Sequence, residues 1–175
     1  MKHLISGFLV SLLLFAGLSS VAQKSEDKSK RPSPPATATQ MVGDAKISID
    51  YSQPSVKGRT IGKDLEPMQG KIWRTGANEA TTFETDKDIL VDAKPLPKGK
   101  YALFTIANGD EWTIIFNKTW NQWGAYDYKE ADDALRVNVK AGKTAAFSEK
   151  LVFNINADGK VSLMWGDAQA DFTVK

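Results

Sequence analysis

Apolar and polar residues alternate along most of the chain after about residue 45, which is the pattern of β-strands with one buried face. In "KISIDYS", residues 46–52, Ile47, Ile49 and Tyr51 fall on the same face. The same period, with many β-branched and aromatic residues, predicts further strands over 81–85, 88–92, 100–108, 111–118, 134–140, 150–156, 160–166 and 170–174.

Turn signals join these strands into hairpins. Asn108-Gly109-Asp110 and Ala157-Asp158-Gly159 each provide residues that tolerate the positive φ of a tight turn. Helical character is confined to "YKEADDAL", residues 128–135, enough for one or two turns. About nine short strands and little helix predict an all-β fold, an antiparallel β-sandwich of jelly-roll-like type. A closed barrel is the alternative architecture.

The first 35 residues follow a different pattern. Residues 1–22 combine a charged start, a long apolar run and a small-residue end at Ala22, and we interpret them as a secretory signal peptide. Residues 23–35, "QKSEDKSKRPSPP", are charged and Pro-rich, which indicates a flexible linker. A single β-sandwich domain is expected over 36–175. The protein is therefore expected in the periplasm or secreted, with no membrane insertion after cleavage.

Composition excludes several chemistries. The chain has no Cys, and its one His is His3 in the signal, so thiol chemistry, His-based triads and His/Cys zinc sites are excluded from the mature protein. We expect no metal site and no cofactor. Without Lys2 the mature chain has 22 basic against 21 acidic residues, a balance that gives no indication of nucleic acid as a partner.

Polar side chains concentrate in "KIWRTGANEATTFET", residues 71–85. Arg74 offers a planar fork for a carboxylate or phosphate, Glu79 can act as an acid, base or acceptor, and a loop is expected between the flanking strands. The alternative is a local role, in which Asn78 forms an Asx-turn and Glu79 pairs with Arg74.

A second candidate segment is "NKTWNQWGAYDY", residues 117–128, which places aromatic rings beside amide side chains. Such a combination suits sugars, since rings stack on C–H faces while amides bind hydroxyls; the alternative is that the rings close the end of the core. The predicted ligand-binding residues from the two segments are Arg74, Asn78, Glu79, Thr82, Trp123 and Tyr126. No residue is assigned as catalytic.

A third segment, residues 51–71, is long for a loop and carries Lys57, Arg59 and Lys63. It lacks the spacing of a phosphate-binding loop, so solvated surface charge is the simpler interpretation.

Several blocks of the chain resemble an uncharacterised secreted family found mainly in Bacteroidetes-type bacteria, domain of unknown function 2911. The blocks are "SPPATATQMVGDAKISIDYSQPSVKGR", "GKIWRTGANEATTFET", "LPKGKYALFTI" with "EWTIIFNK", and "NQWGAYDYKEADDALRV". The resemblance implies a secreted β-rich domain and brings no catalytic residues. The chain departs from the family pattern at Gln53, where the family usually has Arg, and in "EPMQGK", where it has "VPYGK".

Three functions remain open at this stage. The first is a binding module for a small polar ligand or glycan. The others are an envelope protein-interaction domain, or a glycoside-active enzyme in which Glu79 pairs with Asp127, Asp132 or Asp133. Binding is expected rather than catalysis, and oligomeric state is not determined by the sequence. If loops 74–79 and 120–128 converge on one concavity, that concavity is the expected site.

Overall fold

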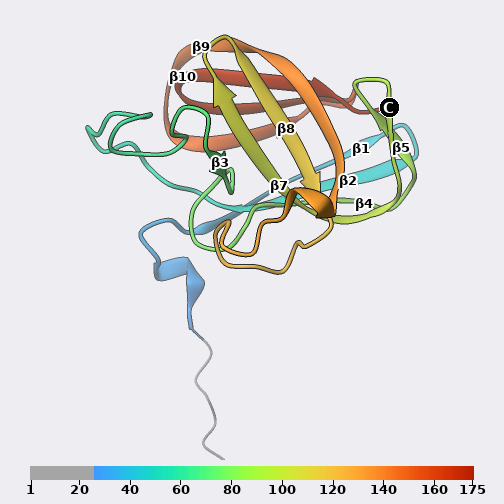
Figure 1. Ribbon diagram of the computed structural model, residues 1–175, viewed down its shortest axis with the longest axis horizontal. Coiled ribbons are helices and arrows are strands. Elements are labelled where there is room, and N and C mark those ends of the chain that lie inside the picture. The colour runs from blue at the N-terminus through green and yellow to red at the C-terminus, as the bar shows by residue number, and fades with distance from the viewer. Residues whose placement is uncertain (1–25) are drawn as a thin grey trace, which may run out of the picture.

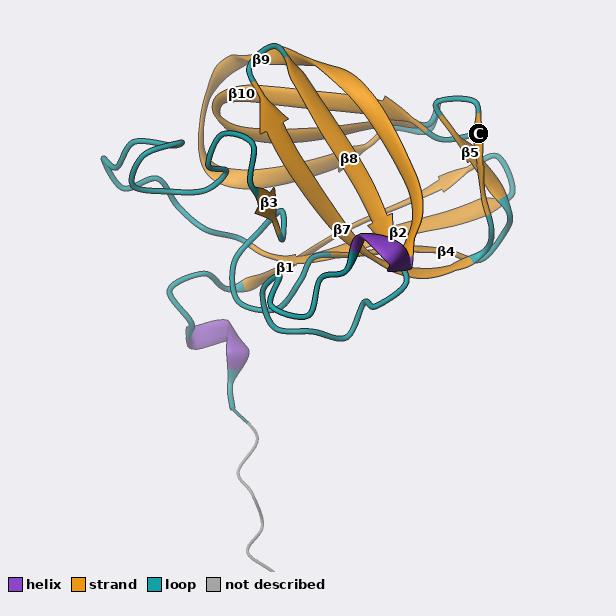
Figure 2. Cartoon of the chain, viewed as in Figure 1, coloured by secondary structure: helices purple, strands orange, loops and turns teal. Residues whose placement is uncertain are grey.

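The computed structural model describes residues 26–175, so the predicted signal peptide lies outside the described residues. Apart from two single-turn 3-10 helices, the elements are strands, which confirms the predicted all-β antiparallel fold with little helix (Figure 2). In chain order the elements are η1 (Lys28–Lys30), β1 (Pro35–Val42), β2 (Ala45–Ser52), β3 (Ile72–Trp73), β4 (Thr82–Thr85), β5 (Ile89–Val91), β6 (Lys94–Leu96), β7 (Gly99–Asn108), β8 (Glu111–Asn117), η2 (Glu130–Asp132), β9 (Asp133–Ile155) and β10 (Lys160–Thr173).

One antiparallel sheet curls around the core in the order β1-β2-β4-β7-β8-β9-β10, with β3 paired to β7 at the side (Figure 1). The β5–β6 hairpin is separate. The long β9 belongs to two layers, because its first residues pair with β8 and its later residues with β10. The chain thus folds back across the sheet, and the two facing layers give the sandwich-like arrangement.

Aromatic rings from both layers meet in the core. Phe83 on β4, Phe116 on β8 and Phe172 on β10 form a triangle with ring centres 5.0, 5.8 and 6.4 Å apart. Nearer the sheet edge, Tyr51 on β2 lies edge-on to Phe153 on β9 at 5.0 Å. Edge-to-face rings of this kind contribute roughly 0.5–1.5 kcal/mol each beyond the area they bury, so these contacts hold the two layers together.

A second, smaller apolar cluster lies on the outer face of β7 and β8. Phe104 and Ile115 are buried there, although the main core is on the opposite face of the sheet. The cover comes from connecting segments, which contribute Ala80 and Tyr128, the latter edge-on to Phe104 at 5.0 Å. Both candidate segments are therefore fixed against the same two strands.

The predicted hairpin turns are confirmed: Gly109 and Gly159 have φ of 62° and 91° between β7 and β8 and between β9 and β10. The turn predicted within 128–135 is η2. The strands differ from the sequence analysis in two respects. β1 and β6 were not predicted. The strands expected over 134–140 and 150–156 are one continuous strand, β9, and those expected over 160–166 and 170–174 are one continuous strand, β10. Neither helix in residues 26–175 has the length or apolar character needed to cross a membrane.

Candidate functional site

The loop that follows β3 is held by its own backbone and by buried hydroxyls. Thr75 and Asn78 adopt positive φ of 55° and 58°, which is rare for a β-branched residue such as Thr75. The Thr75 carbonyl accepts a hydrogen bond from the Thr81 hydroxyl at 2.9 Å, and the Thr75 hydroxyl donates to the Thr105 hydroxyl at 3.2 Å. The left-handed residue before Gly76 is therefore Thr75. Gly76 is required for space, because a Cβ there would lie 2.8 Å from Thr81 Oγ1.

The two candidate loops converge. Glu79 and Trp123 form an antiparallel bridge, and this pairing is extended by two backbone hydrogen bonds. The N–H of Ala80 donates to the Gln122 carbonyl at 3.0 Å, and the N–H of Gly124 donates to the Asn78 carbonyl at 3.0 Å. The sequence left this convergence open, and the structure establishes it.

A cleft of about 240 Å³ opens beside the paired loops. Its walls come from the N-terminal segment, β2, β4, β7 and the 120–122 segment, and they are lined by Lys28, Pro35, Asp50, Tyr51, Ser52, Glu79, Ala80, Thr82, Lys100, Trp120, Asn121 and Gln122. Trp120 is 42% exposed, a large value for an indole. One buried acceptor in the wall, Gln122 Oε1, has no hydrogen-bond partner within residues 26–175.

Opposite charges line the sheet side of this cleft. Lys100 Nζ lies 5.1 Å from the Trp120 ring centre, 3.3 Å from a Glu84 carboxylate oxygen and 3.9 Å from one of Asp50. Strand register explains the grouping, because Asp50 pairs with Thr82 and Glu84 pairs with Lys100 across β2, β4 and β7. The cleft therefore offers an aromatic face together with charged and neutral hydrogen-bonding groups.

Glu79 is engaged by two cations from the N-terminal segment. Lys28 Nζ lies 2.8 Å from Oε1 and Arg31 Nη1 lies 2.8 Å from Oε2. Partial burial alone would raise the pKa of Glu79, but hydrogen bonds from Lys28, from its own backbone N–H and from Arg31 outweigh burial and lower the pKa to about 2. A carboxyl with this pKa is ionised at neutral pH and is a poor general acid.

The predicted ligand-binding residues are distributed over neighbouring positions. Glu79 and Thr82 line the cleft. Asn78 donates from Nδ2 to the Ser33 carbonyl at 3.0 Å, a local contact. Trp123 and Tyr126 are 50% and 82% exposed and do not line the cleft.

Arg74 lies apart from the cleft. It lines a separate depression of about 190 Å³ together with Ser33 and Trp73, and its buried Nε has no hydrogen-bond partner within residues 26–175. It therefore does not pair with Glu79, in contrast to the alternative considered for this segment.

Of the residues that line the cleft, sequence reasoning selected only Glu79 and Thr82, and the residues it missed include Lys28, Asp50, Lys100 and Trp120. Trp120 could have been included, since it belongs to the aromatic segment already singled out. Asp50 and Lys100 carry no local signal, because they are ordinary outward-facing strand residues until the register places them together.

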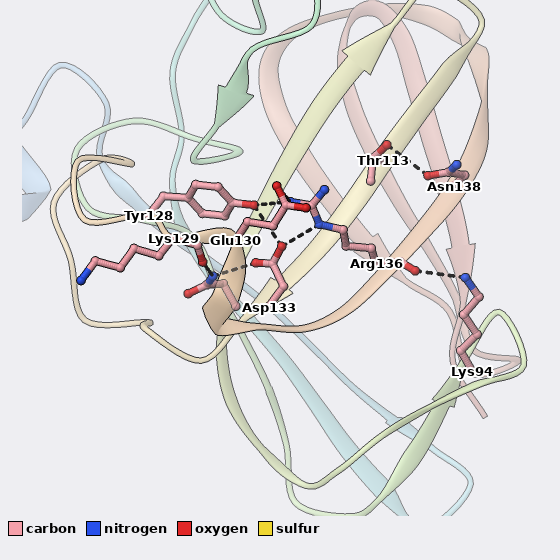
Figure 3. Close-up of polar contacts among 9 residues, drawn as sticks. Lys94, Thr113, Tyr128, Lys129, Glu130, Asp133, Arg136 and Asn138 are labelled. Atoms are coloured by element: carbon pink, nitrogen blue, oxygen red, sulfur yellow. Dashed lines mark hydrogen bonds and ion pairs between the residues drawn. The ribbon is translucent and has the colours of Figure 1, made fainter.

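A polar network anchors the far end of the 117–133 loop (Figure 3). Asp133 accepts hydrogen bonds from Tyr128, Arg136 and the buried Asn117 at 3.0, 2.6 and 2.7 Å. Burial, reinforced by the hydrogen bond to Asp133, raises the pKa of Tyr128 to about 12. Asp132 in turn accepts from the Thr119 hydroxyl at 3.1 Å. Two of the carboxylates considered as catalytic partners of Glu79 thus hold the loop in place.

The third candidate segment, 51–71, packs over β9 and β10. Arg59 donates to the backbone carbonyls of Val56 and Ser55 at 3.1 and 2.7 Å, and Trp165 Nε1 donates to the Glu66 carbonyl at 2.8 Å. The Arg59 guanidinium therefore stabilises the loop's own backbone, a structural role in place of the solvated charge expected for this segment. Within residues 26–175, no group of three or more Asp, Glu, His or Cys side chains is arranged to hold a metal ion.

Comparison with known proteins assigns the chain to a protein family. Searches of curated proteins and of solved structures found no match. The family described as "Protein of unknown function (DUF2911)" matches residues 33–174, which is most of the chain and includes both converging loops and all of β1 to β10. This chain therefore belongs to the DUF2911 family.

Proposed function

We propose that this domain is a binding module for a small polar ligand, and that the ligand is a sugar or a glycan end. The observation that carries the proposal is the cleft beside the converging loops, which combines the exposed Trp120 ring with the polar side chains of Asp50, Thr82 and Lys100. A sugar ring would stack on the indole through its C–H face, and its hydroxyls would hydrogen-bond to these side chains.

The size and charge of the cleft limit the class of ligand that fits it. Its volume of about 240 Å³ is below the roughly 300–1,000 Å³ of sites for drug-sized ligands, which favours one sugar ring or a chain end. Asp50 and Lys100 add an acceptor and a donor on the sheet side. Since both signs of charge are present, a neutral, hydroxyl-rich ligand fits better than a strongly charged one.

Isothermal titration of the mature protein with neutral monosaccharides, amino sugars and sugar acids tests the proposal, with Trp120→Ala as the key variant. We expect at least one neutral sugar to bind. Trp120→Ala should weaken its affinity about tenfold or more, because truncation of a Trp anchor in a binding site commonly costs about 2 kcal/mol or more. Trp123→Ala is the matched control, since this indole is equally exposed but does not line the cleft. Absence of sugar binding, or equal losses in both variants, would contradict the proposal.

The proposed setting is the periplasm or the outside of the cell. It rests on the predicted signal peptide over 1–22. Fractionation of cells that express the full chain, with immunodetection of the shortened mature form, tests it. Uncleaved protein in the cytoplasm would contradict it.

A further inference from the structure

A carboxylate and an indole lie side by side at the rim of the cleft, where Glu79 lines the cleft and Trp123 does not. The bridge between Glu79 and Trp123 fixes the two residues as cross-strand neighbours. Arg31 occupies the position between their side chains, with Nη1 2.8 Å from Glu79 Oε2 and its guanidinium carbon 5.7 Å from the Trp123 ring centre. A carboxylate together with an aromatic face is the combination that binds guanidinium groups, by charge-assisted hydrogen bonding and by cation–π attraction.

Within residues 28–31, the side-chain contacts to the rest of the domain are made by two cations, Lys28 and Arg31. The Arg31 side chain is only 11% exposed, whereas the adjoining η1 has no buried residue. Lys28, three residues earlier, contacts the other oxygen of the same Glu79 carboxylate. Both oxygens thus receive a cation from one short peptide segment. Arg31 also pairs with Glu26, but that acid belongs to the same segment and would leave with it.

The receptor and its occupant belong to different parts of the chain. Glu79 and Trp123 lie inside the family domain, which begins at residue 33, while Lys28 and Arg31 precede it. An occupant on a short tether competes through its effective concentration, on the order of millimolar. A peptide in solution that presents the same contacts must compete with that local concentration.

We propose that Glu79 and Trp123 form a binding site for a basic peptide with Lys and Arg three residues apart, and that Lys28 and Arg31 fill this site within the same chain. The bound peptide places Arg on the indole and divides the two cations between the carboxylate oxygens. In the wild-type protein the N-terminal segment blocks access to the site. The apparent affinity for an added peptide is therefore the intrinsic affinity multiplied by the fraction of molecules in which the site is open.

The test uses a fluorescent peptide with the sequence of residues 26–35, "EDKSKRPSPP", and fluorescence polarisation with the full mature chain. We expect the double variant K28A/R31A to bind this peptide about tenfold or more tighter than wild type, because its site is vacated. K30A is the matched control, since Lys30 pairs with Asp27 and leaves Glu79 untouched; it should behave like wild type. Adding E79Q to K28A/R31A should reduce peptide binding by about tenfold.

Three results would overturn the proposal. They are equal peptide affinity in wild type and K28A/R31A, no effect of E79Q in the double variant, and equal binding of a peptide in which both cations are alanine. Circular dichroism of each variant separates loss of fold from loss of binding. This inference does not depend on the sugar cleft: Trp120→Ala in the K28A/R31A background should bind the peptide as its parent does, so either proposal can fail alone.

Discussion

Replacement of Glu79 by Gln should destabilise the folded protein at neutral pH, and this loss of stability should shrink as the pH falls. The carboxylate has a pKa of about 2 in the folded protein, against an ordinary value of 4.5. If fully expressed, that difference would correspond to about 3 kcal/mol of stabilisation of the folded state. The side chain is 39% exposed, and solvent screening reduces the expected contribution to about 1 kcal/mol.

The sign of the effect follows from the lowered pKa. The stabilisation is fully present above about pH 4.5, where Glu79 is ionised in both states, and it is lost as the pH falls towards about 2. Urea unfolding followed by tryptophan fluorescence should therefore show Glu79→Gln to be about 1 kcal/mol less stable than wild type near neutral pH, with the gap closing in acid.

The double variant K28A/R31A provides the control, since it removes the two cations that contact Glu79. In that background Glu79→Gln should have little effect at any pH, as expected for residues that act as a unit. Equal stability of Glu79→Gln and wild type at neutral pH would refute the reasoning, and so would a gap that persists undiminished in acid.

Three further substitutions test the fold around the site by the same unfolding assay. Gly159→Ala should cost about 2–4 kcal/mol, because its Cβ would lie 2.0 Å from the Val174 carbonyl oxygen at a φ of 91°; unchanged stability would contradict the tight hairpin. Gly124→Ala should cost about 1 kcal/mol, since φ is 64° and the Cβ would lie 3.0 Å from Arg74 Nη1; a stabilised variant would be inconsistent with this geometry. Asn117→Ala should cost about 2–3 kcal/mol through lost buried hydrogen bonds, and a loss below about 0.5 kcal/mol would show that the loop is anchored elsewhere.

Strands with one buried face were predictable, and strands without one were not. Alternation identified β2, β7 and β8 because large apolar residues such as Ile47 and Ile49 mark the core side. The middle of β9, residues 141–150, forms a ribbon with β10 whose side chains are mostly exposed or half-buried. Alternation reports burial rather than extension, so this stretch gave no signal. In β1 the inward positions near its start are the small Ala36 and Ala38, and the alternation is correspondingly weak.

The candidate site was predictable only in part, for a similar reason. Loop composition selected the segments around Glu79 and Trp123, and the structure brings these two segments together. The contacts made by Lys28 and Arg31 were not predictable, because a charged segment without apolar residues has the composition of a linker. Ion pairs depend on where two distant segments meet, and a single sequence gives that position only after the strand register is known.

The span of β9 across both layers has a consequence for how the molecule comes apart. Its early residues pair with β8 and its later residues with β10, so one strand is hydrogen-bonded into both layers. Separation of either layer would break backbone hydrogen bonds along β9, and partial unfolding between the layers is therefore costly. We expect the domain to melt as one cooperative unit, with the slowest amide exchange along the buried parts of this strand.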